Sequence, residues 1–136
     1  MRFKTIAALL ALALAIGACA RKEAAPKAVE VVLTEADAGA TVSVAKGARI
    51  VLRLESNPST GYRWSEVTPP VESVRRLGED AFVAHDTRLV GAPGVQVFTY
   101  EVAAPGRARV ALAYARSWES AEVAPLRAFE ITVVAR

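Results

Sequence analysis

The chain has few of the side chains that perform catalysis. His85 is its only histidine, and it stands beside Asp86 in a polar stretch. Ser59 could complete a Ser–His–Asp set on paper, but no nucleophile-elbow sequence surrounds any serine. With one histidine and one cysteine, a zinc or copper site would depend on carboxylates alone. These residues predict a protein that is not an enzyme and needs no cofactor or metal.

Three short segments carry the more informative residues. Asn57-Pro58-Ser59-Thr60-Gly61-Tyr62 is by itself a turn, because Asn-Pro begins turns and glycine tolerates a positive φ. Gly91-Ala92-Pro93-Gly94 is a flexible connection that lacks the lysine and following helix of a phosphate-binding loop. Arg116-Ser117-Trp118 places an arginine and a tryptophan together, a combination typical of protein interfaces.

The elements between these segments are predicted by apolar residues that alternate with polar ones. Such alternation is typical of half-buried strands. The clear runs are 50–55, 95–102, 107–114 and 129–134, and the weaker ones are 29–34, 41–45, 62–67, 71–76 and 82–84. Glycine and proline separate the runs, and no segment has a helical stripe. The pattern predicts an all-β fold, an immunoglobulin-like β-sandwich.

Strand direction predicts where the three segments lie. Runs 95–102 and 107–114 are joined by four residues, so they form an antiparallel hairpin. Gly91–Gly94 before the hairpin and Arg116–Trp118 after it therefore lie at the same end. If run 50–55 is also antiparallel to 95–102, the Asn57–Gly61 turn joins them. The three segments then form one composite binding edge of loops on a rigid sandwich.

In this order, the three segments resemble the loop motifs of the chagasin-type inhibitors of papain-like cysteine peptidases. The family motifs are Asn-Pro-Thr-Thr-Gly-Tyr, Gly-x-Gly-Gly and Arg-Pro-Trp, and the likeness extends from about Val29 to the C-terminus. The resemblance implies reversible, non-covalent inhibition by three loops that block the cleft. The implied peptidase-binding residues are Asn57, Pro58, Ser59, Thr60, Gly61, Tyr62, Gly91, Ala92, Pro93, Gly94, Arg116, Ser117 and Trp118.

The same resemblance implies a role for each loop. Ser59-Thr60-Gly61 enters the cleft beside the catalytic cysteine, while Arg116 and Trp118 pack on the wall near the catalytic histidine. Gly91–Gly94 covers the opposite side. The sequence departs from the motifs where Ser59 replaces threonine, Pro93 replaces glycine and Ser117 replaces proline.

A different function fits the same fold. An immunoglobulin-like sandwich can also serve as an envelope adhesion or assembly module that binds another protein or a glycan. The small hydroxylated tip at Ser59-Thr60 favours a peptidase wedge, because sugar binding would favour exposed aromatic and acidic residues.

The N-terminal residues indicate export and lipid anchoring. A positive start is followed by an apolar run, 6–16, which is too short for a permanent membrane helix. Ile16-Gly17-Ala18-Cys19 resembles the bacterial lipobox, in which the cysteine is diacylated after cleavage before it. We therefore expect a signal peptide at 1–18, a lipidated tether at 19–28 and the inhibitor domain at 29–136. The residue after Cys19 is Ala20, not the aspartate that retains lipoproteins at the inner membrane. We therefore expect the protein to be anchored in the cell envelope at the outer membrane.

The charge of the mature chain is nearly balanced. The full chain has 17 Lys and Arg and 14 Asp and Glu, and removal of Arg2 and Lys4 with the signal leaves a net charge of +1. No basic stripe with interleaved aromatic residues is present, which argues against nucleic-acid binding. The expected partners are a papain-like cysteine peptidase and, through the lipid on Cys19, a membrane, with the domain monomeric.

Overall fold

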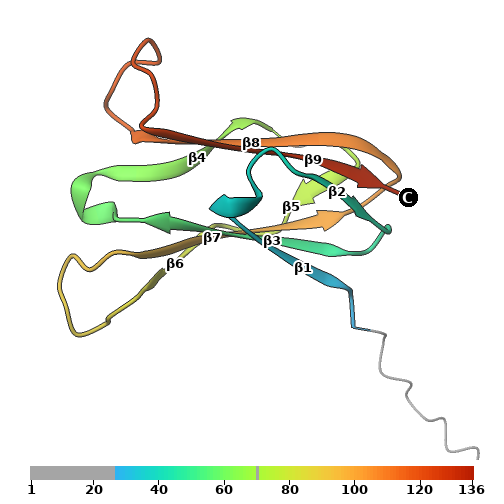
Figure 1. The fold of residues 1–136 in the computed structure, drawn as a ribbon, viewed down its shortest axis with the longest axis horizontal. Helices are drawn as coiled ribbons and strands as arrows, with labels where there is room; N and C mark the ends of the chain where they lie inside the picture. Colours follow the sequence, from blue (N-terminus) through green and yellow to red (C-terminus); the bar gives the residue numbers. More distant parts are fainter. Residues whose placement is uncertain (1–26, 70) are drawn as a thin grey trace, which may run out of the picture.

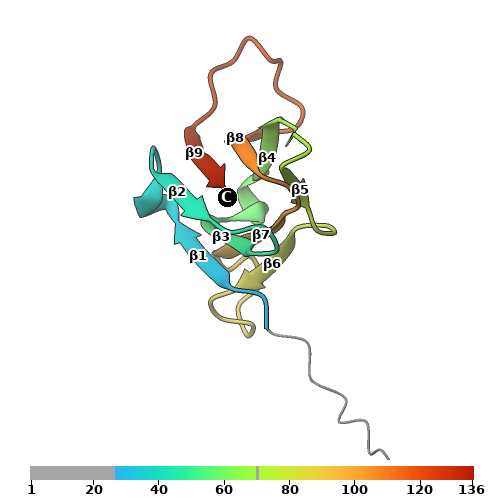
Figure 2. The same ribbon diagram turned by 90° about the vertical axis from the view of Figure 1, so that its right-hand side faces the viewer.

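Two sheets packed face to face form the domain in the computed structural model, which describes residues 27–69 and 71–136 (Figures 1 and 2). The first sheet contains β1 (Glu30–Thr34), β3 (Arg49–Ser56), β7 (Gly94–Val102), β5 (Val74–Arg76) and β6 (Ala81–Ala84). The second contains β2 (Thr41–Val44), β9 (Arg127–Ala135), β8 (Gly106–Arg116) and β4 (Tyr62–Thr68). The 3₁₀ turns η1 (Glu35–Asp37) and η2 (Pro58–Thr60) complete the elements.

The strands follow from the period-two pattern. In β3 the side chains of Ile50, Leu52 and Leu54 are fully buried, while the intervening residues are partly or wholly exposed. Trp64, Phe98, Tyr100, Tyr114 and Phe129 contribute aromatic rings to the same core. Among the described residues, all buried hydrophobic side chains lie between Leu33 and Ala135, within the predicted domain 29–136.

One weak strand is shorter than the sequence predicts. The expected run 71–76 becomes β5 only from Val74 onward. Residues 71–73 turn instead, and the turn is closed by the Val74 amide, which donates to the Val71 carbonyl at 3.0 Å. The segment of η2 is predicted as a turn, and the sequence predicts nothing for the segment of η1, because three residues are too few to show a helical period.

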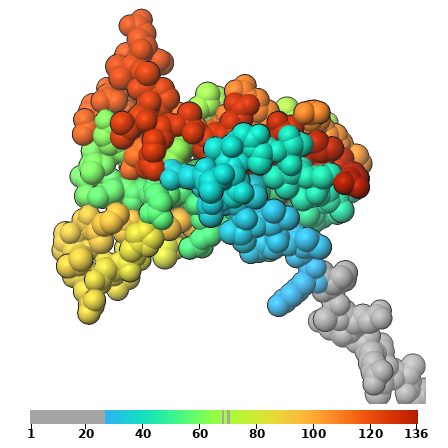
Figure 3. Space-filling view, viewed as in Figure 1, coloured from blue at the N-terminus to red at the C-terminus, as the bar shows by residue number. Residues whose placement is uncertain are grey.

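The strand registers bring three connections to one end of the sandwich. β3 and β7 are antiparallel with Ser56 opposite Gly94, and β4 and β8 are antiparallel with Tyr62 opposite Arg116. The assumed antiparallel pairing of run 50–55 with run 95–102 is therefore confirmed. The predicted hairpin of runs 95–102 and 107–114 is wrong: β7 and β8 run in opposite directions but lie in different sheets, because the short connection between them crosses from one sheet to the other. The two segments next to them still lie at the same end, since each strand is antiparallel to a strand that flanks the β3–β4 turn. Figure 3 shows the result: the β8–β9 connection projects on one side of this end, the β6–β7 connection lies on the other, and the β3–β4 turn lies between them.

The chain enters the sandwich at the opposite end. β1 runs parallel to β3, with Glu30 opposite Arg49, so its first residue lies where β3 begins (Figure 1). The predicted signal peptide, Cys19 and most of the predicted tether lie outside the described residues. Within the described ranges, no helix is long and apolar enough to cross a membrane.

Candidate functional site

The turn between β3 and β4, residues 57–61, holds its own shape and is called the first loop. The Asn57 side-chain oxygen accepts hydrogen bonds from the amide and the hydroxyl of Ser59, at 3.3 and 2.5 Å. The Thr60 hydroxyl donates to the Asn57 carbonyl at 2.6 Å. Gly61 ends the turn with a φ of +83°, a conformation that glycine adopts without strain. The polar side chains of the tip are thus used to fold the loop.

Gly61 has a second requirement that the sequence does not show. A Cβ on this residue would overlap the six-membered ring of Trp118, so the indole lies directly on the glycine. Trp118 is still 69% exposed, because its other side has no cover. The connection between β8 and β9, residues 117–126, is called the third loop. It therefore presents an exposed aromatic face whose position is fixed by the first loop.

Arg116 links the first and third loops. Its Nε donates to the Thr60 carbonyl at 3.2 Å, and its guanidinium lies 4.4 Å from the Tyr62 ring centroid and 5.8 Å from that of Trp118. Glu119 lies 3.8 Å from the guanidinium on the remaining side. Stacking of arginine on aromatic rings is favourable. The Arg116 guanidinium group therefore contacts residues of both loops.

The connection between β6 and β7, residues 85–93, is the second loop, and it touches the first loop at Gly91. The Ser59 hydroxyl lies 3.3 Å from the Gly91 carbonyl, to which it can donate. Ala92 bonds back to Leu89 at 3.4 Å, and the Pro93 carbonyl accepts from the His85 amide at 3.0 Å.

Gly94 begins β7 opposite Ala84 and is required by packing. A Cβ there would overlap the Val83 carbonyl of β6. The three loops together with the residues that flank them, Tyr62, Gly94 and Arg116, are called the three-loop edge. All the predicted peptidase-binding residues lie in it.

Two exposed residues of this edge are not among the predicted peptidase-binding residues. Leu89 and Val90 form the apolar tip of the second loop, beside the predicted Gly91–Gly94 segment. Two adjacent apolar residues between turn residues are the signal that could have found them, because neither belongs to an alternating strand.

An aromatic stack supports the edge from below. Tyr114 lies 5.4 Å from Tyr62 and 5.2 Å from Trp64, and its hydroxyl accepts the Asn57 amide at 2.9 Å. Arg127 covers the Tyr114 ring at 4.2 Å and donates to the Glu55 carbonyl at 2.9 Å. Each aromatic pair is worth about 0.5–1.5 kcal/mol beyond the area it buries. The first loop therefore stands on a rigid, packed base.

The Ser–His–Asp combination considered from the sequence does not form. The Ser59 hydroxyl bonds to Asn57, whereas His85 Nε2 contacts a Glu55 carboxylate oxygen at 2.8 Å. The Asp86 carboxylate is occupied by Arg88, whose hydrogen bonds lower the pKa of that carboxyl. Ser59, His85 and Asp86 therefore do not form a triad. Among the described residues, no group of three or more His, Cys, Asp or Glu is placed to hold a metal ion.

Comparisons with known proteins agree with this geometry. The family model described as chagasin family peptidase inhibitor I42 matches residues 43–133, more than half of the chain. Chagasin of Trypanosoma cruzi is 37% identical over 90 residues, which are 63% of this chain and 81% of chagasin.

Solved structures share the fold. The crystal structure of the cysteine protease inhibitor EhICP2 from Entamoeba histolytica superposes with a TM-score of 0.70 at 30% identity, over 82% of this chain and all of that one. PbICP-C, solved in complex with falcipain-2, has a TM-score of 0.54 at 15% identity over 79% of this chain and 99% of its own, and shows the fold alone.

These matches favour a peptidase inhibitor over an adhesion or assembly module. The predicted all-β sandwich is confirmed, and the family is one of inhibitors, so the prediction that the chain is not an enzyme is confirmed as well. The chain belongs to the chagasin family of peptidase inhibitors.

Proposed function

We propose that this inhibitor blocks the cleft of a papain-like cysteine peptidase with the three-loop edge, reversibly and without a covalent bond. The first loop enters the cleft, and the second and third loops cover its two sides. The observation that carries the proposal is the contact of Trp118 with Gly61 beneath an otherwise exposed indole. The target class is supported by the family and by the relatives named as inhibitors of cysteine proteases.

The prefolded edge explains how binding becomes strong. A protease–inhibitor interface buries about 800 Å² on each partner, and nanomolar affinity needs roughly 12 kcal/mol net. Ordering flexible loops at an interface costs binding energy. Here the first loop is already closed by its own hydrogen bonds, accepts a hydrogen bond from Arg116, and contacts the second loop at Gly91. Little of the interaction energy is then needed to order it.

The same hydrogen bonds explain how an inserted loop escapes hydrolysis. A peptidase must bring the scissile carbonyl oxygen to its oxyanion-stabilising donors. The Asn57 carbonyl accepts from the Thr60 amide and hydroxyl, and the Pro58 carbonyl accepts from the Gly61 amide at 2.9 Å. The Thr60 carbonyl accepts from Arg116. The compact turn would have to open before a substrate-like extended strand could form.

The test of this proposal is titration of residues 29–136 into papain with a fluorogenic peptide substrate, with trypsin as the serine-peptidase control. We expect saturable inhibition of papain alone. Trp118→Ala should weaken it, whereas Lys46→Ala, at an exposed residue of the opposite end of the sandwich, should not. Full papain activity at micromolar domain would overturn the proposal.

We further propose that the exported chain is anchored by lipid on Cys19, in the outer membrane. The lipobox-like tetrad supports this, as does the geometry, since the chain enters the sandwich at the end opposite the three-loop edge. A tether before Val29 would therefore present the edge away from the membrane. Metabolic labelling with an alkynyl fatty acid tests the anchor: the wild type should be labelled and Cys19→Ser should not. An unlabelled wild type would contradict it.

A further inference from the structure

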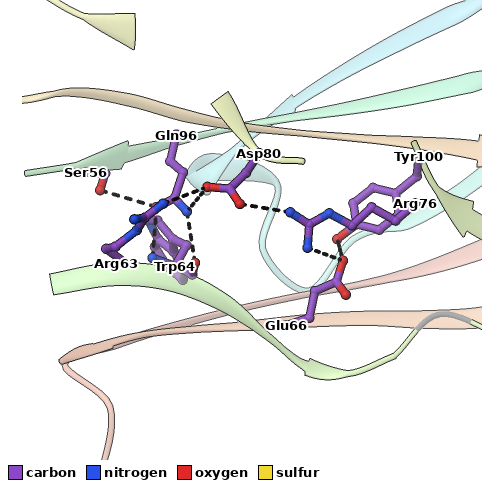
Figure 4. A network of polar contacts seen from close by, with 8 residues as sticks. All are labelled: Ser56, Arg63, Trp64, Glu66, Arg76, Asp80, Gln96 and Tyr100. Carbon is purple, nitrogen blue, oxygen red and sulfur yellow. Dashed lines mark hydrogen bonds and ion pairs between the residues drawn. The ribbon is translucent and has the colours of Figure 1, made fainter. Parts of the chain in front are cut away.

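Gln96 occupies a core position in β7 where an apolar side chain would be expected. It shares a face with Phe98 and Tyr100, and only 2% of its surface is exposed. Its amide oxygen accepts the Trp64 amide at 2.9 Å, and its amide nitrogen donates to the Trp64 carbonyl at 2.9 Å (Figure 4). The side chain thus pairs with both backbone polar groups of one residue, as a residue of a neighbouring strand would.

This pairing closes a seam between the two sheets. β4 is the last strand of its sheet, so its outer edge has no strand to bond. β7 belongs to the other sheet, and no backbone ladder joins the two. Gln96 supplies the missing donor and acceptor at Trp64. A second side-chain link lies further along, where the Tyr100 hydroxyl donates to Glu66 at 2.6 Å.

The position of the seam matters because the first loop crosses between the sheets there. The loop leaves β3 after Ser56 and enters β4 at Tyr62, two residues before Trp64. The Ser56 hydroxyl also donates to the Gln96 oxygen, at 3.4 Å. One amide therefore contacts the strands on both sides of the first loop, and it lies two residues after Gly94, where the second loop ends.

Asp80 fixes which way the amide points. Its carboxylate accepts from the Gln96 nitrogen at 2.8 Å, and it is itself held by Arg76 at 2.9 Å and Arg63 at 3.2 Å. A carboxylate only accepts hydrogen bonds, so the Gln96 nitrogen must face Asp80 and the Trp64 carbonyl. Only in this orientation does the Gln96 oxygen meet a donor, the Trp64 amide, and the Gln96 nitrogen meet acceptors, the Trp64 carbonyl and the Asp80 carboxylate.

We propose that Gln96, oriented by Asp80, is the positioning residue that sets the separation of the two strands carrying the first loop and thereby its fit into a peptidase cleft. This rests on the proposed inhibition. Gln96 touches no target, so its effect on affinity passes through Trp64 and Ser56. An error in strand separation is transferred directly to the tip of the loop, because the loop is too short to absorb it.

The test uses substitutions of Gln96 and Asp80, the two partners of this hydrogen bond, in the domain of residues 29–136. Gln96→Glu opposes two carboxylates, and Gln96→Met removes the donor and acceptor with similar volume. Adding Asp80→Asn to Gln96→Glu lets the new amide donate to the new carboxylate, which removes the opposition of two carboxylates but leaves the Trp64 carbonyl without its donor. Val102→Ala, buried at the far end of β7, is the control for stability alone.

Papain affinity is measured at a temperature where thermal unfolding shows every variant folded. We expect Gln96→Glu and Gln96→Met to raise the dissociation constant at least tenfold, and Val102→Ala to bind like the wild type. The double variant should recover only part of the Gln96→Glu loss, because the Trp64 carbonyl still lacks its donor. Affinities within twofold of the wild type for both single variants would overturn the proposal, as would equal losses in Val102→Ala.

Amide exchange separates this inference from the proposed function. In Gln96→Met the Trp64 amide and the amides of residues 59–61 should exchange at least tenfold faster, whatever the target is. If the wild type fails to inhibit papain while this exchange effect is present, the proposed function fails and the positioning role stands. Unchanged exchange at Trp64 and in the first loop would refute the positioning role itself.

Discussion

Gly61→Ala separates the two tasks of the glycine that ends the first loop. The left-handed conformation at φ +83° costs a non-glycine residue roughly 1–2 kcal/mol, which should appear as lost stability. The new methyl group also overlaps the Trp118 ring, so the indole must leave its place. Loss of an aromatic anchor costs on the order of 2–4 kcal/mol of binding. The dissociation constant should therefore rise roughly 30-fold to several hundred-fold, at 1.4 kcal/mol for each factor of ten.

Gly47→Ala is the matched control for this prediction. Gly47 has a φ of +88°, no neighbour within 4 Å of the added methyl group, and a position at the opposite end of the sandwich. It should lose similar stability in thermal unfolding while inhibiting papain like the wild type. In a Trp118→Ala background, Gly61→Ala should cost little further affinity, because the ring it displaces is already gone. Wild-type inhibition by folded Gly61→Ala, or full additivity of the two changes, would refute the reasoning.

Three further predictions concern the supports of the edge. Tyr114→Phe removes the acceptor for the Asn57 amide and should cost about 1–2 kcal/mol of unfolding free energy in denaturant titration; no loss would mean that water replaces the hydroxyl. Arg116→Lys keeps the charge but loses the planar guanidinium over Tyr62, so papain inhibition should weaken several-fold. Unchanged affinity would mean that only the charge of Arg116 matters. Burial alone raises the pKa of Asp80, but hydrogen bonds from Gln96 and Arg76 lower it below its ordinary 3.8. Because the pKa of Asp80 is lower in the folded state, the ionised carboxylate stabilises the fold above pH 3.8, and this stabilisation is lost as the pH falls below that value. Asp80→Asn should therefore flatten the loss of thermal stability below pH 4, and an unaltered acid profile would show that Asp80 does not contribute to it.

The strands and the loop order were accessible from the sequence because their signals are local. Alternation in β3 and β7 predicts strands, and three loop segments in a fixed order identify the family. The parallel pairings of β1 with β3 and β2 with β9 had no such signal, since they join segments distant in the chain. The contact between Gly61 and Trp118 is likewise long-range, and glycine at a turn already had a sufficient local explanation.

The sequence does carry a signal for the buried Gln96. Positions 96, 98, 100 and 102 share one face of β7, and three of them are core residues. A polar side chain in that series indicates a buried group with a partner, because an unpaired amide in a core is costly. Its partner could not be predicted, since the Trp64 peptide belongs to another sheet and no side-chain pattern marks a free backbone edge.

Competition for the cleft tests most directly that the three-loop edge blocks a peptidase active site. Binding of residues 29–136 is measured by calorimetry to free papain and to papain whose cleft is filled by a covalent peptidyl label on the catalytic cysteine. We expect one domain to bind each free papain and none to bind the labelled enzyme. Equal affinity for both forms would mean that the domain grips papain elsewhere, and would contradict insertion of the first loop.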